Sequence, residues 1–421
     1  MTIAELFETR KADLRWNTSY PLSPDDWKEY RVHGRLPFSN DMSLSFYIHI
    51  PFCRQLCSFC EYTRMLCPAE NTQELYLRTV ALDIQRFKEE HKGRKLLGFD
   101  IGGGTPTSLS EANFYCLMEV YREAIAGMPL SDDYEPSIEA TFNTLSSSKL
   151  HAMASNGFQR LSLGVQSSCK SLLHSHSRVN CDEQNMAEWL NAAHEAGIKK
   201  VNLDFMYGLK GQDESTIIHD LELIERLHPQ QVTLYELRTN MLAGQESFSK
   251  NELYCQYTQY YSGLIKMGYN AHFGQNTFSV NRHDEGTSSY LRKRMLNGAP
   301  YKGFGLAAQS MSSHGVSYNI GKLSCNPHQV LNATGYPEEY TYMLPPHELA
   351  SKYLAVSAYN GSFSTKRLKD FGADNEQLSL ILDFCFSNGL LRKGKTERVY
   401  ITPKGFMHYG ALFSLFINPK P

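Results

Sequence analysis

Between residue 45 and about residue 270, short apolar runs alternate with longer segments in which apolar residues recur every three or four positions. Short runs rich in Val, Ile, Leu and Phe are typical of buried parallel strands, and the longer period is typical of helices. The pattern therefore predicts six strand–helix units. The strands are expected at 45–50, 95–101, 137–143, 160–167, 199–209 and 231–238, and the helices at 72–91, 110–125, 146–157, 186–197, 214–228 and 252–268.

Six strand–helix units can form an open doubly wound sheet or a partial barrel, so the fold class is α/β in either case. Polar or glycine residues follow at the carboxyl ends of most predicted strands, where βα barrels carry their chemistry. These residues are Cys53, Gly103, Asn143, Gln166, Asp204 and Glu236. We therefore expect the functional site at that edge.

The segments outside this core differ from it in pattern. Residues 1–44 read as an N-terminal extension to a 45–270 core. Residues 271–344, rich in Gly, Asn, Ser and Tyr, are predicted to be connecting loops with short elements that extend the barrel. Residues 345–421 predict a small helical domain of winged-helix-like character, because several helices precede the strand-like RVYITPKG and a final helix.

Composition narrows the class of protein. The chain has 421 residues, 42% hydrophobic content and a net charge of -2, as expected for a globular protein without strong attraction to nucleic acid. No apolar run reaches the length of a membrane span. The charged N-terminus lacks the order of a secretion signal, so a cytoplasmic location is expected.

Three of the ten cysteines form one compact motif, Cys53-x3-Cys57-x2-Cys60. The other seven are scattered singly and are expected to be small buried hydrophobic residues. A structural zinc site uses four ligands, and no second cysteine pair supplies the fourth. A [4Fe–4S] cluster with three cysteine ligands keeps one iron open for a small chelating ligand. His174 and His176 could form a separate metal pair, although two loop histidines are more often simply polar.

The motif and several later segments resemble the radical S-adenosylmethionine (SAM) superfamily, and in particular its oxygen-independent coproporphyrinogen III oxidase-like (HemN-like) branch. The segments are YIHIPFC before and into the cysteine loop, GGGTP at 102–106, LSLGVQS with Arg178 downstream, LDFMYGL at 203–209 and YKGFGLAAQS at 301–310. The resemblance covers residue 45 to the end. It implies a partial (β/α)6 barrel with a small C-terminal HemN-type domain.

The resemblance also implies a chemistry and its residues. Cys53, Cys57 and Cys60 would hold a [4Fe–4S] cluster whose open iron is chelated by SAM, and one-electron cleavage of SAM would give a 5′-deoxyadenosyl radical. Positions that match SAM-binding motifs, including those for a second SAM molecule, are Gly103, Gly104, Thr105, Glu139, Gln166, Arg178 and Asp204. Tyr47 is expected to point into the same site, and the catalytic candidates are Tyr47 and Glu139.

Two departures from the family narrow the expected reaction. The oxidase has a further cysteine where this chain has Tyr62, and the His-Asn-x-x-Tyr-Trp segment of heme chaperones has no counterpart in 278–296. Within the resemblance, the group that remains is the HemN-like (class C) methyltransferases, which bind two SAM molecules. This group implies methylation of an sp² carbon of an aromatic, quinone or tetrapyrrole-like substrate, with a flavodoxin or ferredoxin as electron donor. A tetrapyrrole oxidase and a heme-binding chaperone stay as alternatives. The basic segment 291–296 is interpreted as a helix face, or as a partner for substrate carboxylates.

Overall fold

The structure, a computed structural model, describes the chain except for residues 13–19, 22–23, 238–247, 320–338, 359 and 418–421. Among the described residues, twelve strands form one sheet in the order β1-β14-β13-β12-β11-β2-β5-β6-β7-β8-β9-β10. Their bounds are β1 Arg31–Val32, β2 Ser43–Ile50, β5 Lys95–Gly103, β6 Ser137–Ala140, β7 Arg160–Gln166, β8 Lys200–Tyr207, β9 Gln231–Glu236, β10 Thr277–Ser279, β11 Tyr301–Phe304, β12 Gln309–Ser312, β13 Gly315–Asn319 and β14 Glu339–Met343.

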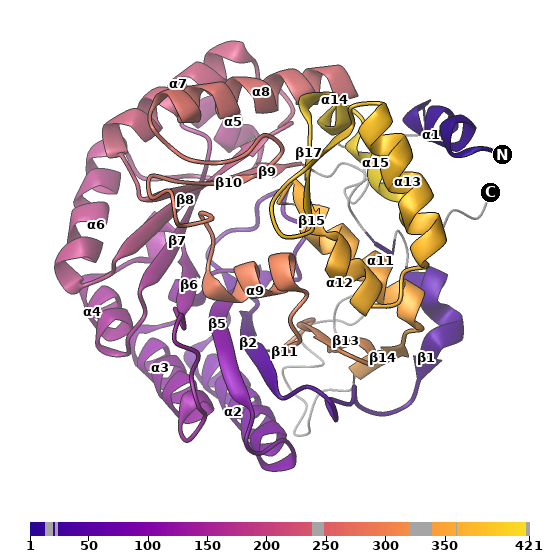
Figure 1. The fold of residues 1–421 in the computed structure, drawn as a ribbon. Helices are drawn as coiled ribbons and strands as arrows, with labels where there is room; N and C mark the ends of the chain where they lie inside the picture. Colours follow the sequence, from indigo (N-terminus) through magenta and orange to yellow (C-terminus); the bar gives the residue numbers. More distant parts are fainter. Residues whose placement is uncertain (13–19, 22–23, 238–247, 320–338, 359, 418–421) are drawn as a thin grey trace.

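The six predicted strands, β2 and β5 to β9, pair in parallel and in chain order, and helices connect them along the outer side of the curved sheet (Figure 1). The helices are α2 Glu70–Glu90, α3 Glu111–Ile125, α4 Ser147–Ser155, α5 Lys170–Ser175, α6 Glu183–Ala196, α7 Glu214–Leu227 and α8 Lys250–Lys266. Each predicted strand–helix unit is present, and the sheet stays open. The fold is a partial α/β barrel, as expected.

Local signals explain most helix ends. The side chain of Ser110 caps α3 by accepting the Asn113 backbone N–H. Gly197 ends α6 in a left-handed conformation. The predicted strand 137–143 is too long, because β6 ends at Ala140 and residues 142–144 turn into a short 3₁₀ helix.

The two faces of the strands divide the side chains by polarity. In β2, Phe46, Ile48 and Ile50 are fully buried in the core beneath the helices. Tyr47 and His49 alternate with them and so lie on the inner face of the sheet. The same alternation carries polar residues of the neighbouring strands to this inner face, where the functional site lies.

Residues 271–344 contain more regular structure than the sequence predicts. The helix α9 (Ser289–Asn297) leads into β11, which pairs in parallel with β2, and β12 to β14 continue the sheet as antiparallel strands. Serine, threonine and asparagine are fully buried in these strands at Ser310, Ser317, Asn319 and Thr341. Such buried polar positions hide the apolar pattern by which a strand is recognised.

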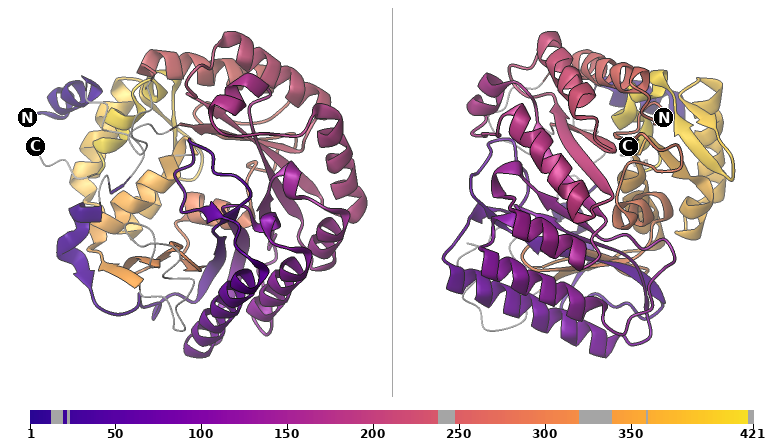
Figure 2. Two further views of the ribbon diagram at one scale, coloured as in Figure 1. Left: turned by 180° about the vertical axis from the view of Figure 1, so that it is seen from behind. Right: turned by 90° about the vertical axis from the view of Figure 1, so that its left-hand side faces the viewer.

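The C-terminal part has a hydrophobic core of its own. Its elements are α11 Pro346–Ala358, β15 Ser362–Ser364, α12 Thr365–Asp370, α13 Asn375–Ser387, β16 Leu391–Lys393, β17 Arg398–Ile401, α14 Pro403–Phe406 and α15 Tyr409–Ser414. The three strands form a small sheet in the order β15-β17-β16, and the helices pack beside it. The sequence predicted the helices and the strand at RVYITPKG, which is β17, but not β15 and β16, and the winged-helix-like assignment stays a prediction. The C-terminal part lies across the molecule from α4 and α6 (Figures 1 and 2).

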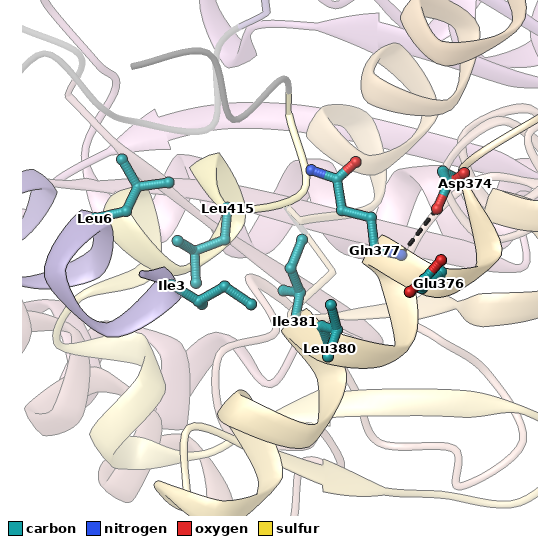
Figure 3. A pocket seen from close by; sticks show the side chains of 8 residues that line it. All are labelled: Ile3, Leu6, Asp374, Glu376, Gln377, Leu380, Ile381 and Leu415. Carbon is teal, nitrogen blue, oxygen red and sulfur yellow. Dashed lines mark hydrogen bonds between the residues drawn. The ribbon is translucent and has the colours of Figure 1, made fainter. Parts of the chain in front are cut away.

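The N-terminal helix α1 (Ile3–Ala12) packs on this C-terminal part, where Phe7 joins its core. Between α1, α13 and Leu415 lies an apolar pocket of about 290 Å³, into which Ile3, Leu6 and Ile381 project (Figure 3).

The strand β1 joins the edge of the large sheet beside β14. In the described part of the chain, the helices are all too short or too polar to cross a bilayer.

Candidate active site

The cysteine loop follows β2 directly and is held at both ends by backbone hydrogen bonds. Cys53 ends β3 (Phe52–Cys53), which pairs with β4 (Met65–Leu66), and the Cys53 carbonyl accepts the Cys67 N–H at 2.8 Å. Within the loop, the Ser58 N–H donates to the His176 carbonyl at 3.0 Å. Backbone hydrogen bonds therefore tie the loop to β4 and to the segment after α5.

The three predicted ligands are free thiols in this loop. Cys53 and Cys57 are buried and Cys60 is half-buried, and Cys57 packs in an apolar cluster with Phe59 and Met206. Among the described residues, no three His, Cys or carboxylate side chains meet as they would around a single metal ion. Thiolates on a four-iron cluster bind different iron atoms and need no such common point, so the triad fits a cluster.

The glycine triplet passes through a space that admits no side chain. A Cβ atom at Gly102 would lie 2.5 Å from Glu139 Oε2, one at Gly103 would lie 2.6 Å from the His49 ring, and one at Gly104 would lie 2.9 Å from Cys53 Sγ. Gly103 also has a φ of +112°, which favours glycine. The triplet thus brings β5 into direct contact with Glu139, His49 and the cysteine loop.

The amide groups of Gly103, Gly104 and Thr105 already donate hydrogen bonds inside the protein. Gly103 N–H donates to Glu139 Oε2 at 3.0 Å, Gly104 N–H to the Ile50 carbonyl at 2.8 Å and Thr105 N–H to the Phe52 carbonyl at 2.8 Å. Thr105 Oγ1 lies 3.8 Å from Cys53 Sγ. What the motif offers a ligand in this structure is close approach of the backbone rather than unused donors. Its predicted contact with the methionine part of SAM stays a prediction.

Three carboxyl groups gather on the inner face. Desolvation and the neighbouring Asp204 raise the pKa of Glu139 to about 7, and desolvation raises the pKa of Asp204 to about 6. Asp100 was not singled out from the sequence, and desolvation also raises its pKa to about 7. Arg160, which is buried and bonded to Gln231 and Ser137, lowers all three values. The group can hold or release protons near neutral pH, and a bound ammonium group would favour its ionised form.

Arg178 is buried rather than solvated. It donates to the Gly164 carbonyl, to Asn180 Oδ1 at 3.2 Å and towards Cys57 Sγ at 3.8 Å. Gln166 lies beside it, because a Cβ atom on Gly164 would meet both Gln166 Nε2 and Arg178 Nη2. Gln166 has a positive φ of 72° at an irregularity between β7 and β8. The structure thus brings Arg178 to the cysteine loop and places Gln166 beside Arg178.

Tyr47 is oriented by a residue that sequence reasoning missed. His49 donates from Nε2 to the Thr63 carbonyl at 2.8 Å, so its Nδ1 faces the Tyr47 hydroxyl, 3.4 Å away, as an acceptor. Desolvation lowers the pKa of His49 to about 4, which keeps the ring neutral. The available signal was the strand period, since residues two apart share a face.

The alternative histidine metal pair is not formed. His174 is exposed on α5, whereas His176 is buried, donates from Nε2 to the Lys210 carbonyl and accepts from Ser58 through Nδ1. These two side chains therefore have separate surroundings. His176 serves instead to fasten the cysteine loop to the segment after β8.

The part of the chain that carries this site is similar in sequence to known proteins. The sequence profile of the Radical SAM superfamily matches residues 47–224. The heme chaperone HemW of Haemophilus influenzae is 33% identical over 200 residues, which cover 46% of this chain and 51% of that protein. The oxygen-independent coproporphyrinogen III oxidase of Escherichia coli is 30% identical over 221 residues, 52% of this chain and 48% of that protein. The chain thus spans about half the length of these two relatives.

Two similarities extend further. The heme chaperone HemW of Bacillus subtilis is 25% identical over 387 residues, which cover 89% of this chain and 99% of that protein. Among solved structures, coproporphyrinogen III oxidase (HemN) from Escherichia coli matches with a TM-score of 0.72 at 24% identity, over 90% of this chain and 91% of that one. The last match concerns the fold.

Proposed function

The chain carries a radical SAM domain over residues 47–224, and we propose that it is an enzyme which transfers a methyl group from a second SAM to an sp² carbon of a conjugated substrate. Its cofactors are a [4Fe–4S] cluster and SAM, as in the family. When bound, the cluster supplies the electron that cleaves SAM reductively. Cys53, Cys57 and Cys60 would hold it, and the observation that carries the proposal is the meeting of this triad with the glycine triplet and Glu139.

The surrounding residues support a SAM site next to the triad. Glu139 keeps one oxygen on the Gly103 N–H and is otherwise open to the inner face, where it can accept from the SAM ammonium. Tyr47 and the neutral His49 border the same place. Gln166, Arg178 and Asp204 extend the polar lining towards β7 and β8, and we assign them to the second SAM.

Methyl transfer, rather than oxidation, is favoured by Tyr62. The resemblance places a further cysteine of the oxidase at this position. Among the described cysteines outside the triad, Cys169 packs against the same apolar cluster as Cys57 and Cys60, but it directly precedes α5 and does not belong to the cysteine loop. Radical addition to an sp² carbon needs no protein nucleophile. The substrate proposed is an aromatic, quinone or tetrapyrrole-like molecule, and the electron donor a flavodoxin or a ferredoxin.

A second candidate, heme or tetrapyrrole handling, is favoured by a separate observation. The heme chaperone HemW of Bacillus subtilis aligns along almost its whole length, with the C-terminal part included. A chaperone would bind heme and turn over little SAM. An oxidase-like enzyme would consume SAM without forming S-adenosylhomocysteine.

Product analysis separates these functions. The protein is reconstituted with iron and sulfide without oxygen, then given reductant, SAM and a cell extract as substrate source. Methyl transfer predicts that 5′-deoxyadenosine and S-adenosylhomocysteine rise together. If only 5′-deoxyadenosine rises, methyl transfer is refuted and an oxidase-like reaction is favoured. Neither product, together with tight heme binding, would favour the chaperone.

The cluster assignment has its own test. Cys57→Ala should lose the brown iron–sulfur chromophore and most of its iron, because a triad ligand is removed. Cys255→Ala is the matched control, since Cys255 is an exposed cysteine on α8. Full iron content in Cys57→Ala would refute the assigned ligand set.

A further inference from the structure

Arg294 projects from α9 with a half-buried side chain on the β11 side of the site. Its guanidinium lies over the ring of Tyr301, with 4.5 Å between Cζ and the ring centroid. One N–H group donates to Gln309 Oε1 at 2.9 Å, and that oxygen also accepts from the Tyr301 hydroxyl. The surroundings of this cation are therefore aromatic and neutral.

The neighbouring basic residues of the helix are paired, and Arg294 is not. Arg292 and Lys293 both bond to Asp133 at 2.6 Å. Among the residues that the structure describes, no carboxylate lies within 4.0 Å of the Arg294 guanidinium, and its Nε is buried without a hydrogen-bond partner. A partly desolvated cation without a counter-charge is unfavourable, so an anionic group of a ligand would bind favourably here.

Tyr290 connects this cation to the predicted SAM site. Its ring stacks on Tyr47, with centroids 5.7 Å apart, and its hydroxyl lies 3.5 Å from Arg294 Nη1. Burial lowers the pKa of Arg294, but the nearby hydroxyls of Tyr301, Tyr290 and Tyr62 outweigh burial and raise it overall. The guanidinium is thus charged at every working pH, and it lies near the cysteine loop that carries Tyr62.

The inner face is therefore divided by charge. The carboxyl groups of Asp100, Glu139 and Asp204 lie on β5, β6 and β8, while Arg294 lies beside β11 and β12 on the other side of Tyr47. A ligand placed between the two regions would direct an acidic group towards Arg294. The planar guanidinium, flanked by tyrosine rings, suits a flat carboxylate next to a conjugated system.

We propose that Arg294 binds a carboxylate of the substrate that lies on the inner face beside Tyr47 and Tyr290, so that the substrate class is a conjugated ring with acidic side chains. The inference rests on the proposed function, because a radical SAM site holds both SAM and a substrate. The α-carboxylate of a second SAM presents the same chemistry. The experiment is designed to distinguish these two sources.

The probe pair is coproporphyrin III, which carries propionate side chains, and its methyl ester, which has the same ring without the charge. Both are titrated by fluorescence against the anaerobically reconstituted full chain. Wild-type protein should prefer the free acid, and Arg294→Gln should weaken binding of the acid by about tenfold or more while leaving the ester unchanged. Arg294→Lys should retain part of the preference. Arg292→Gln, which loses a surface arginine of the same helix, should behave as wild type.

A second measurement counts bound SAM by equilibrium dialysis with radiolabelled SAM. If Arg294→Gln loses one bound SAM per chain and keeps the porphyrin preference, the carboxylate belongs to the second SAM and not to the substrate. If neither porphyrin preference nor SAM binding differs between wild type and Arg294→Gln, the proposal is overturned. Melting curves and iron content confirm that each variant folds and holds its cluster.

Failure of the proposed function is recognised separately. If the wild-type protein forms no 5′-deoxyadenosine but shows the Arg294-dependent preference, the proposed enzymatic function is refuted and the proposed carboxylate site is retained. If the wild-type protein cleaves SAM, but ligand binding is the same in wild type and Arg294→Gln, the enzymatic function is retained and the carboxylate site is refuted.

Discussion

The rings of Tyr47 and Tyr290 stack with an interplanar angle of 21°, and this contact joins β2 to α9. Tyr290 is buried, so Tyr290→Ala should destabilise the apo-protein by about 3 kcal/mol or more. It should also weaken SAM binding, because Tyr47 loses the ring that fixes its orientation. Urea unfolding and equilibrium dialysis measure the two effects.

Tyr290→Phe is the control for this prediction. It keeps the stacked ring and removes only a hydroxyl whose bond to Arg294 is long, at 3.5 Å. We expect a loss of less than about 1.5 kcal/mol and near-normal SAM affinity. Equal SAM affinity in both variants would show that the stack does not orient Tyr47 for the cofactor.

Gly103→Ala tests the tight packing of the glycine triplet. The new methyl group would strain a backbone with a φ of +112° and meet the His49 ring at 2.6 Å. Because both the strand end and the cysteine loop would shift, we expect low iron incorporation and a lower melting temperature. Iron analysis and thermal unfolding measure these changes.

Gly127→Ala separates backbone strain from the clash. Gly127 also has a positive φ, +71°, but no atom lies within 4 Å of its Cβ position. This variant should lose only about 1 to 2 kcal/mol and reconstitute its cluster normally. If Gly103→Ala behaves in the same way, the contact with His49 has no importance for the site.

The strongly periodic segments of the chain were predictable, and the site's supporting residues were only partly so. The six strands and their helices follow from apolar periodicity alone, and the cysteine spacing pointed to a loop that lies against the glycine triplet, whose role as a cluster site stays a prediction. Arg160 and Asp100 were not predicted, because a polar residue inside an apolar strand shows neither its face nor its partners. Arg294 was noticed only as part of a basic helix face, since the pairing of Arg292 and Lys293 with Asp133 depends on the fold.

Arg178→Met tests the cation beside the triad. The change removes a buried charge and a donor 3.8 Å from Cys57 Sγ. Positive charge and hydrogen bonds to sulfur stabilise the reduced form of an iron–sulfur cluster, so its reduction potential should become more negative. Redox titration followed by EPR measures the potential. Arg122→Met, on the exposed surface of α3, should leave it unchanged, and an unaltered potential in Arg178→Met would contradict the expected influence.

Asp100 should make stability depend on pH in a direction opposite to that of an ordinary surface acid. Its Oδ2 accepts from Ser288 at 2.6 Å, its Oδ1 is buried without a partner, and desolvation raises its pKa to about 7. From about pH 4 to pH 7 the folded state therefore keeps a proton that the unfolded state has released. The favourable contribution of protonated Asp100 to the free energy of unfolding is therefore fully present below pH 4 and is lost as pH rises through 7.

Asp100→Asn holds no titrating proton, so its melting temperature should rise relative to wild type, by about 2 °C, between pH 5 and pH 8. His49 acts in the opposite direction, because its lowered pKa favours folding as pH rises from about 4 to 6.5. Both proteins contain His49, so its contribution cancels when their melting temperatures are compared at the same pH. Asp133→Asn is the matched control. Burial raises the pKa of Asp133, but its bonds to Lys293 and Arg292 outweigh this and lower it overall, so its effect should be constant across the same range. A constant difference for Asp100→Asn as well would show that Asp100 is already ionised at pH 5.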